Sequence, residues 1–239
     1  MLIPKIIRTS WKTKDIIDFD HPLIEHGIRS LVKLNPDWKF EIHDDDEVNE
    51  YLKSMLDASD YEALSNRHIV EKTDVWRLVK LYMEGGIYVD LDRLHDIPLS
   101  KAIPVNCMWV IPTCRDYDFS HDIMITAPNN PVFLETLKLN LHRRKLGYTN
   151  VYSLGAQTYM HAITNFFVHW KVNTNPKLEL FNYIRKNINS SEFAMTIRED
   201  IPIETITFRN SIGITQEQHE EMKRDMYKKT DVKHWTNEW

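Results

Sequence analysis

Residues 70–99 read VEKTDVWRLVKLYMEGGIYVDLDRLHDIPL, and this stretch decides the fold. Its first half carries apolar residues at the spacing of one helix face. Gly85 and Gly86 predict the end of that helix, because glycine adopts the left-handed conformation common at helix C-termini. Residues 87–92 then alternate with period two, which predicts a strand. The apolar helix positions are Val75, Trp76, Leu78, Val79 and Tyr82.

Two acidic residues stand at the end of this predicted strand. In an extended chain, Asp90 and Asp92 point to the same face as Tyr88. Burying a carboxylate is unfavourable unless it is paired or bound to a cation. A hard divalent cation is the simplest explanation for two carboxylates here, although an isolated D-x-D also occurs at solvated strand ends and turns.

The helix before the turn carries a second charged pair. Asp74 and Arg77 share a helix face, which by itself is compatible with a surface ion pair. The ordered combination of T-D-x-x-R, a long apolar helix, G-G-I-Y and D-L-D is more specific than its parts. It resembles the signature of the DXD-containing glycosyltransferases of family 32, roughly [S/A]-D-x-x-R followed by G-G-x-Y-x-D-x-D. Thr73 stands at the small-residue position of that signature.

The resemblance implies a fold and a chemistry. The fold is GT-A, an α/β/α sandwich of Rossmann-like character with a mixed central sheet. The chemistry is retaining transfer of a sugar from a nucleotide-diphosphate sugar to a hydroxyl group, with Mn²⁺ or Mg²⁺ neutralising the diphosphate. Asp92 would be the main metal ligand, and Asp90 would contact the metal, ribose or sugar. Asp74 would accept hydrogen bonds from sugar hydroxyls, and Arg77 would contact the sugar or phosphate, which makes these four the expected catalytic residues.

The N-terminal segment contributes two candidate substrate-binding residues. Residues 5–8 predict a short buried strand, and ligands of α/β sheets bind where such strands end. The segment is similar to the family opening I-P-K-I-I-H-Q-T-W-K, with Pro4 and Trp11 kept. In the family this loop lies by the nucleotide base and ribose, so Thr9 and Trp11 are expected there. A tryptophan after a strand is equally compatible with a place in the core.

Two later segments carry the rest of the resemblance. Gly155 falls where the family often has T-G-P, at a helix start that approaches donor and acceptor, although Ala156 replaces the proline. His234 and Trp239 fit the family's C-terminal histidine and serine-tryptophan, with Glu238 in place of serine. The resemblance implies that His234 is a metal ligand, since Mn²⁺ accepts oxygen and nitrogen ligands, and that Trp239 closes over the sugar.

Composition is that of a globular chain. The 239 residues are 42% hydrophobic and 27% charged, which predicts a single domain over residues 1–239. We expect residues 1–100 to hold the nucleotide sugar, and residues 101–239 to face the acceptor and close the site with the tail. The net charge of -5 argues against a nucleic-acid partner.

Cysteine content and hydropathy bear on the compartment. Cys107 and Cys114 are too far apart for a C-x-x-C motif, which favours a reducing environment. We see no apolar run long enough for a transmembrane segment and no signal-peptide pattern at the N-terminus. We therefore expect a cytoplasmic enzyme of bacterial or viral type, with a trimmed luminal Golgi domain as the alternative. Nothing in the sequence indicates an oligomeric state.

The remaining periodicity predicts alternating helices and strands. Asp44, Asp45 and Asp46 precede a helix over residues 47–56, so we interpret them as its N-terminal cap and not as a metal site. Asn130 and Pro131 are expected to start another helix. Residues 57–65 are expected to form a polar loop. Strands are expected at residues 38–42, 108–111 and 122–127, and further helices at residues 24–34, 132–141 and 215–229.

The sequence indicates the substrates only by class. A UDP-sugar is the favoured donor, with GDP-mannose as the alternative, and the acceptor is a glycan or other hydroxyl compound. A different metal-dependent phosphate-ester enzyme would need further acid or histidine clusters, which do not occur at a recognised spacing. A catalytically inactive nucleotide-sugar-binding module is the second alternative. The residues that argue against it are all intact: Asp74, Arg77, Asp90, Asp92 and His234.

Overall fold

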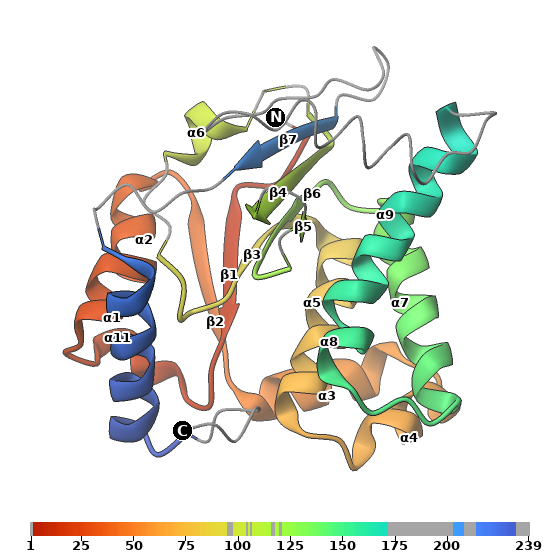
Figure 1. Ribbon diagram of the computed structural model, residues 1–239, viewed down its shortest axis with the longest axis horizontal. Coiled ribbons are helices and arrows are strands. Elements are labelled where there is room, and N and C mark those ends of the chain that lie inside the picture. Colours follow the sequence, from red (N-terminus) through yellow and green to blue (C-terminus); the bar gives the residue numbers. More distant parts are fainter. Residues whose placement is uncertain are drawn as a thin grey trace.

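A mixed β-sheet forms the middle of the molecule, a computed structural model (Figure 1). The structure describes residues 2–94, 98–103, 105, 107–115, 118–119, 121–171, 203–207 and 214–232. The strand order is β2-β1-β3-β6-β4-β5, and β7 pairs with β4. The strand β1 is parallel to β2 and β3, whereas β6 is antiparallel to β3 and β4. The strands are β1 (Ile6–Ser10), β2 (Lys39–His43), β3 (Gly86–Val89), β4 (Trp109–Arg115), β5 (Asp118–Phe119), β6 (Ile123–Thr126) and β7 (Ile203–Thr207).

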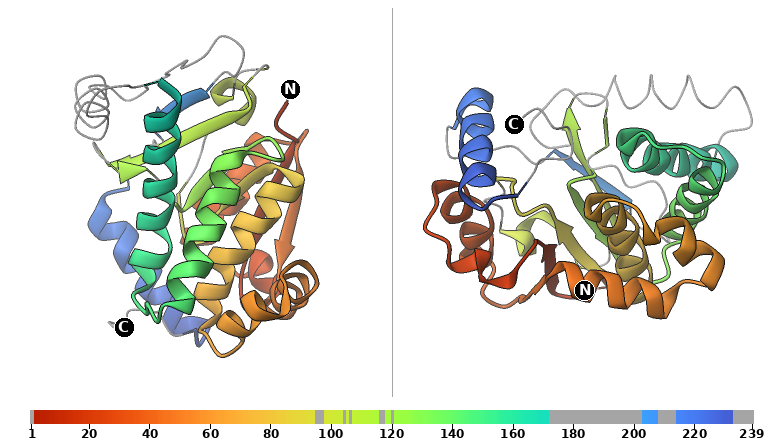
Figure 2. Two further views of the ribbon diagram at one scale, coloured as in Figure 1. Left: turned by 90° about the vertical axis from the view of Figure 1, so that its right-hand side faces the viewer. Right: turned by 90° about the horizontal axis from the view of Figure 1, so that it is seen from below.

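Helices cover both faces of this sheet, as Figure 1 and the two further views in Figure 2 show. No helix in the described ranges is both long and apolar enough to span a bilayer. One face carries α3 (Asp45–Met55), α4 (Ala58–Ser65), α5 (Ile69–Glu84), α7 (Pro131–Lys145), α8 (Val151–Leu154) and α9 (Ala156–Lys171). The other carries α1 (Pro22–Ile24), η2 (Glu25–Arg29), α2 (Ser30–Leu34) and α11 (Gln216–Lys229). Two short helices, η1 (Lys14–Asp18) and α6 (Leu99–Ala102), complete the described set.

The strand β3 lies inside the sheet and is buried on both faces. Tyr88 packs in the hydrophobic cluster that includes Trp76 of α5. Ile87 and Val89 pack in the opposite cluster, which includes Met226 of α11. The alternation predicted for this strand is therefore confirmed over β3, and its C-terminal end is fixed between two layers.

The turn between α5 and β3 has the conformation that its glycines predict. Gly85 ends α5 with φ 65°, and Gly86 follows with φ 100°. A Cβ atom on Gly85 would lie 2.7 Å from the backbone nitrogen of Pro128. Glycine therefore meets both a conformational and a steric requirement at the position that directs α5 into β3.

Two sequence expectations about helices differ from the structure. Residues 57–65 are not a loop, because Asp57 caps α4 by accepting the backbone N–H of Asp60 at 2.8 Å. Residues 24–34 do not form one α-helix, since Gly27 interrupts the segment with φ -92° and ψ -105°. A Cβ atom on Gly27 would lie 2.5 Å from the carbonyl oxygen of Arg93, so this kink lets the segment approach the loop after β3.

The expected helix caps are confirmed. Asp44 and Glu47 form a capping box at the start of α3, which is the role assigned to the acidic run. Asn130 accepts the backbone N–H of Val132 at 3.0 Å and caps α7.

Candidate active site

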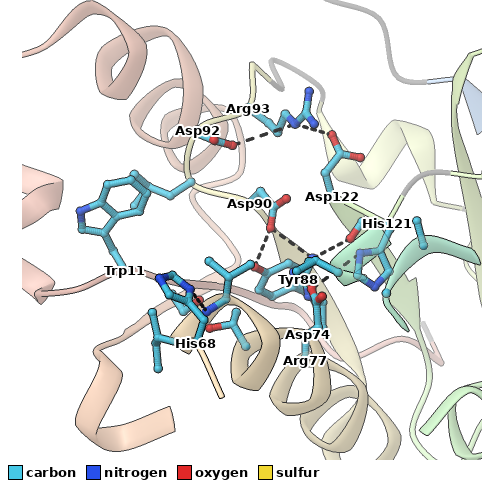
Figure 3. A pocket seen from close by; sticks show the side chains of 18 of the residues that line it. Trp11, His68, Asp74, Arg77, Tyr88, Asp90, Asp92, Arg93, His121 and Asp122 are labelled. Carbon is cyan, nitrogen blue, oxygen red and sulfur yellow. Dashed lines mark hydrogen bonds and ion pairs between the residues drawn. The ribbon is translucent and has the colours of Figure 1, made fainter. Parts of the chain in front are cut away.

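A cavity of about 630 Å³ opens where β1 and β3 end (Figure 3). Because these strands are parallel neighbours, their carboxyl ends meet at the same edge of the sheet, where ligands of α/β sheets bind. The wall is completed by side chains of α5, the segment before β6, the α8–α9 junction and α11. Six of the residues expected to act in catalysis or binding line it: Trp11, Asp74, Arg77, Asp90, Asp92 and Gly155.

Arg77 joins two of the carboxylates. Its guanidinium group donates to Asp74 and, at 3.2 Å, to Oδ1 of Asp90. It also donates to the carbonyl oxygen of His121 at 2.8 Å and lies over the ring of Tyr88. The side chains of Arg77 and Asp74 are each 5% exposed, so this is a buried cluster and not a surface ion pair. Removing Arg77 would leave the buried carboxylate of Asp74 without its ion-pair partner.

Asp90 lies among other acidic groups. The hydroxyl group of Tyr88 donates to its Oδ1 atom at 2.6 Å. Burial raises the pKa of Asp90, the charges of Asp92 and Asp122 raise it further, and Arg77 offsets these effects only in part. A cation at this point would relieve the repulsion, so the electrostatics of the site fit a positively charged ligand.

Asp92 does not share a face with Asp90, contrary to the expectation from period two. The strand ends at Val89, and the N–H of Arg93 donates to the carbonyl oxygen of Asp90 at 3.2 Å in a turn. This turn directs Asp92 to α11. Figure 3 shows Asp92 beside Arg93, apart from the group formed by Tyr88 and Asp90.

Two side chains of α11 hold the carboxylate of Asp92. Its Oδ2 atom lies 3.0 Å from Nζ of Lys223 and accepts the hydroxyl hydrogen of Tyr227 at 3.1 Å. Burial by itself would raise the pKa of Asp92, but Lys223, with Arg93 and Tyr227, lowers it below its ordinary value. Asp92 is therefore held in its charged form, which is the form that binds metal ions.

Asp90 and Asp92 offer the hard oxygen ligands that Mn²⁺ and Mg²⁺ prefer. Within the ranges described, no three His, Cys, Asp or Glu side chains are arranged as a complete metal site. A nucleotide-bound cation does not require one, because it is commonly held by one or two carboxylates together with phosphate oxygens and water. The two acids therefore fit such a cation. His234 and Trp239, the other residues expected here, lie outside the described residues.

The loop after β1 brings Trp11 to the cavity but not Thr9. Trp11 lines the wall, and its ring meets that of Tyr227 edge-on, with 5.3 Å between centroids. Thr9 is fully buried within β1 and is not among the lining residues, which include its neighbour Ser10. Of the two residues expected to bind the nucleotide here, the structure thus places one at the cavity.

Gly155 allows the α8–α9 junction to approach Asp74 closely. A Cβ atom at this position would lie 2.9 Å from Oδ2 of Asp74 and 3.2 Å from Cε1 of His121. Any side chain would therefore displace the carboxylate or the imidazole. This contact gives a physical reason for glycine at the cavity wall.

Several lining residues were not identified from the sequence. His121 is one, and burial, with the charge of Arg77, lowers the pKa of its imidazole well below the ordinary value. Arg93 forms an ion pair with Asp122 at 2.8 Å. Lys223 and Tyr227 are four residues apart on α11, which predicts a shared helix face but not what that face contacts.

Comparison with known proteins identifies similar sequences. Residues 23–109 match the protein-family model described as "Glycosyltransferase sugar-binding region containing DXD motif". The chain is 25% identical over 201 residues to mannosyl phosphorylinositol ceramide synthase SUR1 of Saccharomyces cerevisiae, covering 80% of this chain and 50% of that protein. It is 31% identical over 164 residues to inositol phosphoceramide mannosyltransferase 3 of Schizosaccharomyces pombe, covering 64% of this chain and 42% of that protein. The chain thus spans half or less of the length of these relatives.

A solved structure matches the fold. PaToxG glycosyltransferase has a TM-score of 0.54 and 19% sequence identity to the chain, and the match covers 78% of each. This likeness confirms the GT-A type of α/β fold.

Proposed function

The chain belongs to the family of glycosyltransferases with a DXD sugar-binding region, and on this premise we propose that it transfers a sugar from a nucleotide-diphosphate sugar to a hydroxyl acceptor. The reaction requires Mn²⁺ or Mg²⁺ and retains the anomeric configuration. The observation that carries the proposal is that Asp74, Arg77, Asp90 and Asp92 all line the same cavity. A retaining mechanism is supported by the family resemblance of the signature residues.

A mannosyl donor has the best support. The names of the two fungal relatives specify mannosyl transfer, so GDP-mannose now precedes the UDP-sugars that the sequence favoured. The same names make inositol phosphoceramide the first acceptor to test. Inositol phosphoceramide carries free hydroxyl groups, which agrees with the acceptor class expected from the sequence.

Different residues of the chain would bind the diphosphate, the sugar and the base of the donor. Asp90 and Asp92 would hold the divalent cation, which supplies positive charge to the departing diphosphate. Asp74 is held in orientation by Arg77, and its carboxylate oxygens can accept hydrogen bonds from sugar hydroxyls. The ring of Trp11 offers a flat apolar surface at the wall for the nucleotide base.

The test is release of nucleoside diphosphate by the purified chain. GDP-mannose, UDP-glucose and UDP-galactose are each incubated with Mn²⁺, with and without inositol phosphoceramide in detergent micelles. We expect GDP release from GDP-mannose that increases with acceptor and is lost when EDTA is added. The anomeric proton of the product, measured by NMR, reports the configuration. Absence of turnover with every donor would contradict the proposal.

A matched pair of variants ties the activity to this cavity. Asp90→Asn removes a carboxylate at the end of β3, whereas Asp46→Asn removes an exposed one from the first turn of α3. Asp90→Asn is expected to lose turnover and Asp46→Asn to retain it.

A further inference from the structure

We infer that Lys223 is a binding residue for the diphosphate of the donor, and that its ammonium group exchanges Asp92 for a phosphate oxygen when a cation binds Asp92. This inference rests on the proposed function. It adds a residue from α11, far from the signature sequence, to the donor site.

One face of α11 is directed at Asp92. His219, Lys223 and Tyr227 are four residues apart, so they lie in a row on the helix. His219 Nε2 is 2.9 Å from the carbonyl oxygen of Asp92, Lys223 Nζ is 3.0 Å from its Oδ2 atom, and the Tyr227 hydroxyl is 3.1 Å from the same atom. Since His219 and Tyr227 already hold the backbone and the carboxylate, orienting Asp92 does not require a lysine.

The other charges in the cavity favour a contact between the Lys223 ammonium group and the diphosphate. Arg77 is engaged by Asp74 and Asp90, and Arg93 forms an ion pair with Asp122 at 2.8 Å. A divalent cation on Asp92 would repel the nearby ammonium of Lys223, while the diphosphate would attract it. After the exchange, the carboxylate of Asp92 would be paired with the cation and the ammonium of Lys223 with a phosphate oxygen.

The side chain of Lys223 is suited to this exchange. It lines the cavity, and lysine carries three donors on a flexible four-carbon stem, so the ammonium can change partners while the helix stays in place. Helix α11 has other anchors, because Met226 is fully buried and Asp225 contacts Nε2 of His21 at 3.1 Å. Replacing Lys223 by methionine is therefore expected to leave α11 docked.

The experiment is calorimetric titration of the wild type, Lys223→Met and Lys223→Arg with Mn²⁺ alone, and then with GDP, UDP and guanosine at saturating Mn²⁺. We expect Lys223→Met to bind Mn²⁺ at least as tightly as the wild type, because a competing charge is gone. It should bind the preferred nucleoside diphosphate about 10- to 100-fold more weakly, as expected for loss of a charge-assisted hydrogen bond. Guanosine binding should not change, and Lys223→Arg should recover most of the lost affinity.

The control is Lys228→Met, which removes an exposed lysine of the same helix and should bind as the wild type does. Unchanged nucleoside diphosphate affinity in Lys223→Met would overturn the inference and leave the proposed function intact. Weaker binding of Mn²⁺ alone would also overturn it, because Lys223 would then only position Asp92. A wild type that binds no nucleoside diphosphate with Mn²⁺ would overturn the proposed function and this inference together.

Discussion

At the scale of single residues, Asp90 and Asp92 are two positions apart and yet are held by different layers of the sandwich. Asp90 is bound by Tyr88 and by Arg77 of α5, whereas Asp92 is bound by Lys223 and Tyr227 of α11. The two carboxylates thus have different hydrogen-bond partners, although the charge of Asp92 also acts on Asp90. Burial and neighbouring acids raise the pKa of Asp90. Burial acts in the same direction on Asp92, but Lys223, Arg93 and Tyr227 together lower the pKa of that carboxyl group.

Replacement of Asp92 by asparagine tests the charge of this residue. Asp92→Asn is expected to abolish sugar transfer, because a neutral amide is a weak ligand for a divalent cation. It should also lower the free energy of unfolding by about 1–3 kcal/mol, since Lys223 loses its charged partner. Donor turnover and urea denaturation measure the two effects. Turnover near the wild-type rate in the presence of Mn²⁺ would refute the assignment.

Replacement of Gly155 by alanine tests a steric contact. The added Cβ atom would lie 2.9 Å from Asp74 Oδ2, so Gly155→Ala should displace Asp74 and lower stability by about 1–3 kcal/mol. Donor affinity, measured by calorimetry, should fall as well. Gly147→Ala is the control, because a Cβ atom there meets nothing within 4 Å although its φ of 85° disfavours alanine. It should lose stability but not donor affinity, and equal loss of affinity in both would contradict the steric account.

At the scale of elements, α5 supplies Asp74 and Arg77 to the site, and a buried ion pair joins this helix to α7. Arg144 contacts Glu71 and also donates from Nε to Asn140 at 2.7 Å. The side chain of Arg144 is fully buried and that of Glu71 is 9% exposed. Such a pair fixes the two helices relative to each other, provided that both charges are present.

Loss of one partner of this pair should be costly. Arg144→Met is expected to lower the free energy of unfolding by about 3–5 kcal/mol, because it leaves the Glu71 carboxylate buried without compensation. The double variant Glu71→Leu with Arg144→Met should regain most of the loss. Urea denaturation provides the comparison, and Lys138→Met, an exposed change on α7, is the control. A single variant as stable as the wild type would show that the pair is not structurally important.

The elements that local patterns specify could be predicted from the sequence. Helical spacing, the two glycines and period two predict α5, the turn and β3, and the capping residues predict the starts of α3 and α7. The prediction of a loop at residues 57–65 was wrong. Helix α4 buries only Leu64, so its sequence shows no apolar stripe at helical spacing.

The direction of Asp92 could not be predicted, because it depends on a distant strand. The pairing of β3 with β6 ends where Val89 meets Ile123, so the chain leaves the sheet before the second aspartate. Nothing within residues 87–92 marks this point. The contacts of Lys223 and Tyr227 with Asp92 join segments far apart in the chain, and helical spacing alone does not reveal such a partner.

At the scale of the whole molecule, the cavity lies where the two helical layers meet the carboxyl edge of the sheet. The sheet behind the cavity is tied together by Arg8 of β1, which is buried and contacts Glu41 of β2 and Glu84 of α5, both at 2.8 Å. Arg8 also donates to the carbonyl oxygen of Gly85 at 2.5 Å. One guanidinium group therefore connects two strands and the turn that leads into β3.

This connection predicts how stability depends on pH. Burial would raise the pKa of Glu41, but Lys39 and Arg8 outweigh it and lower the pKa from 4.5 to about 2. A lowered folded-state pKa contributes stability that is present above the unfolded value and is lost as the pH falls toward the folded one. Between about pH 5 and pH 2 the wild type should therefore lose about 1–3 kcal/mol more than Glu41→Gln.

Urea denaturation at several pH values measures this difference. Glu135→Gln, which changes an exposed carboxylate of α7, is the control and should follow the wild type. Parallel curves for the wild type and Glu41→Gln would contradict the role given to the contact between Arg8 and Glu41.

The measurement that tests the central claim most directly is the thermal unfolding of the wild type with GDP and with UDP, each in Mn²⁺ and in EDTA. Ligands that bind the native state raise the melting temperature by mass action. If the site binds a nucleoside diphosphate only together with a cation, the melting temperature should rise with one of the two nucleotides in Mn²⁺ and with neither in EDTA. An unchanged melting temperature in all four conditions, or the same rise in Mn²⁺ and EDTA, would contradict it.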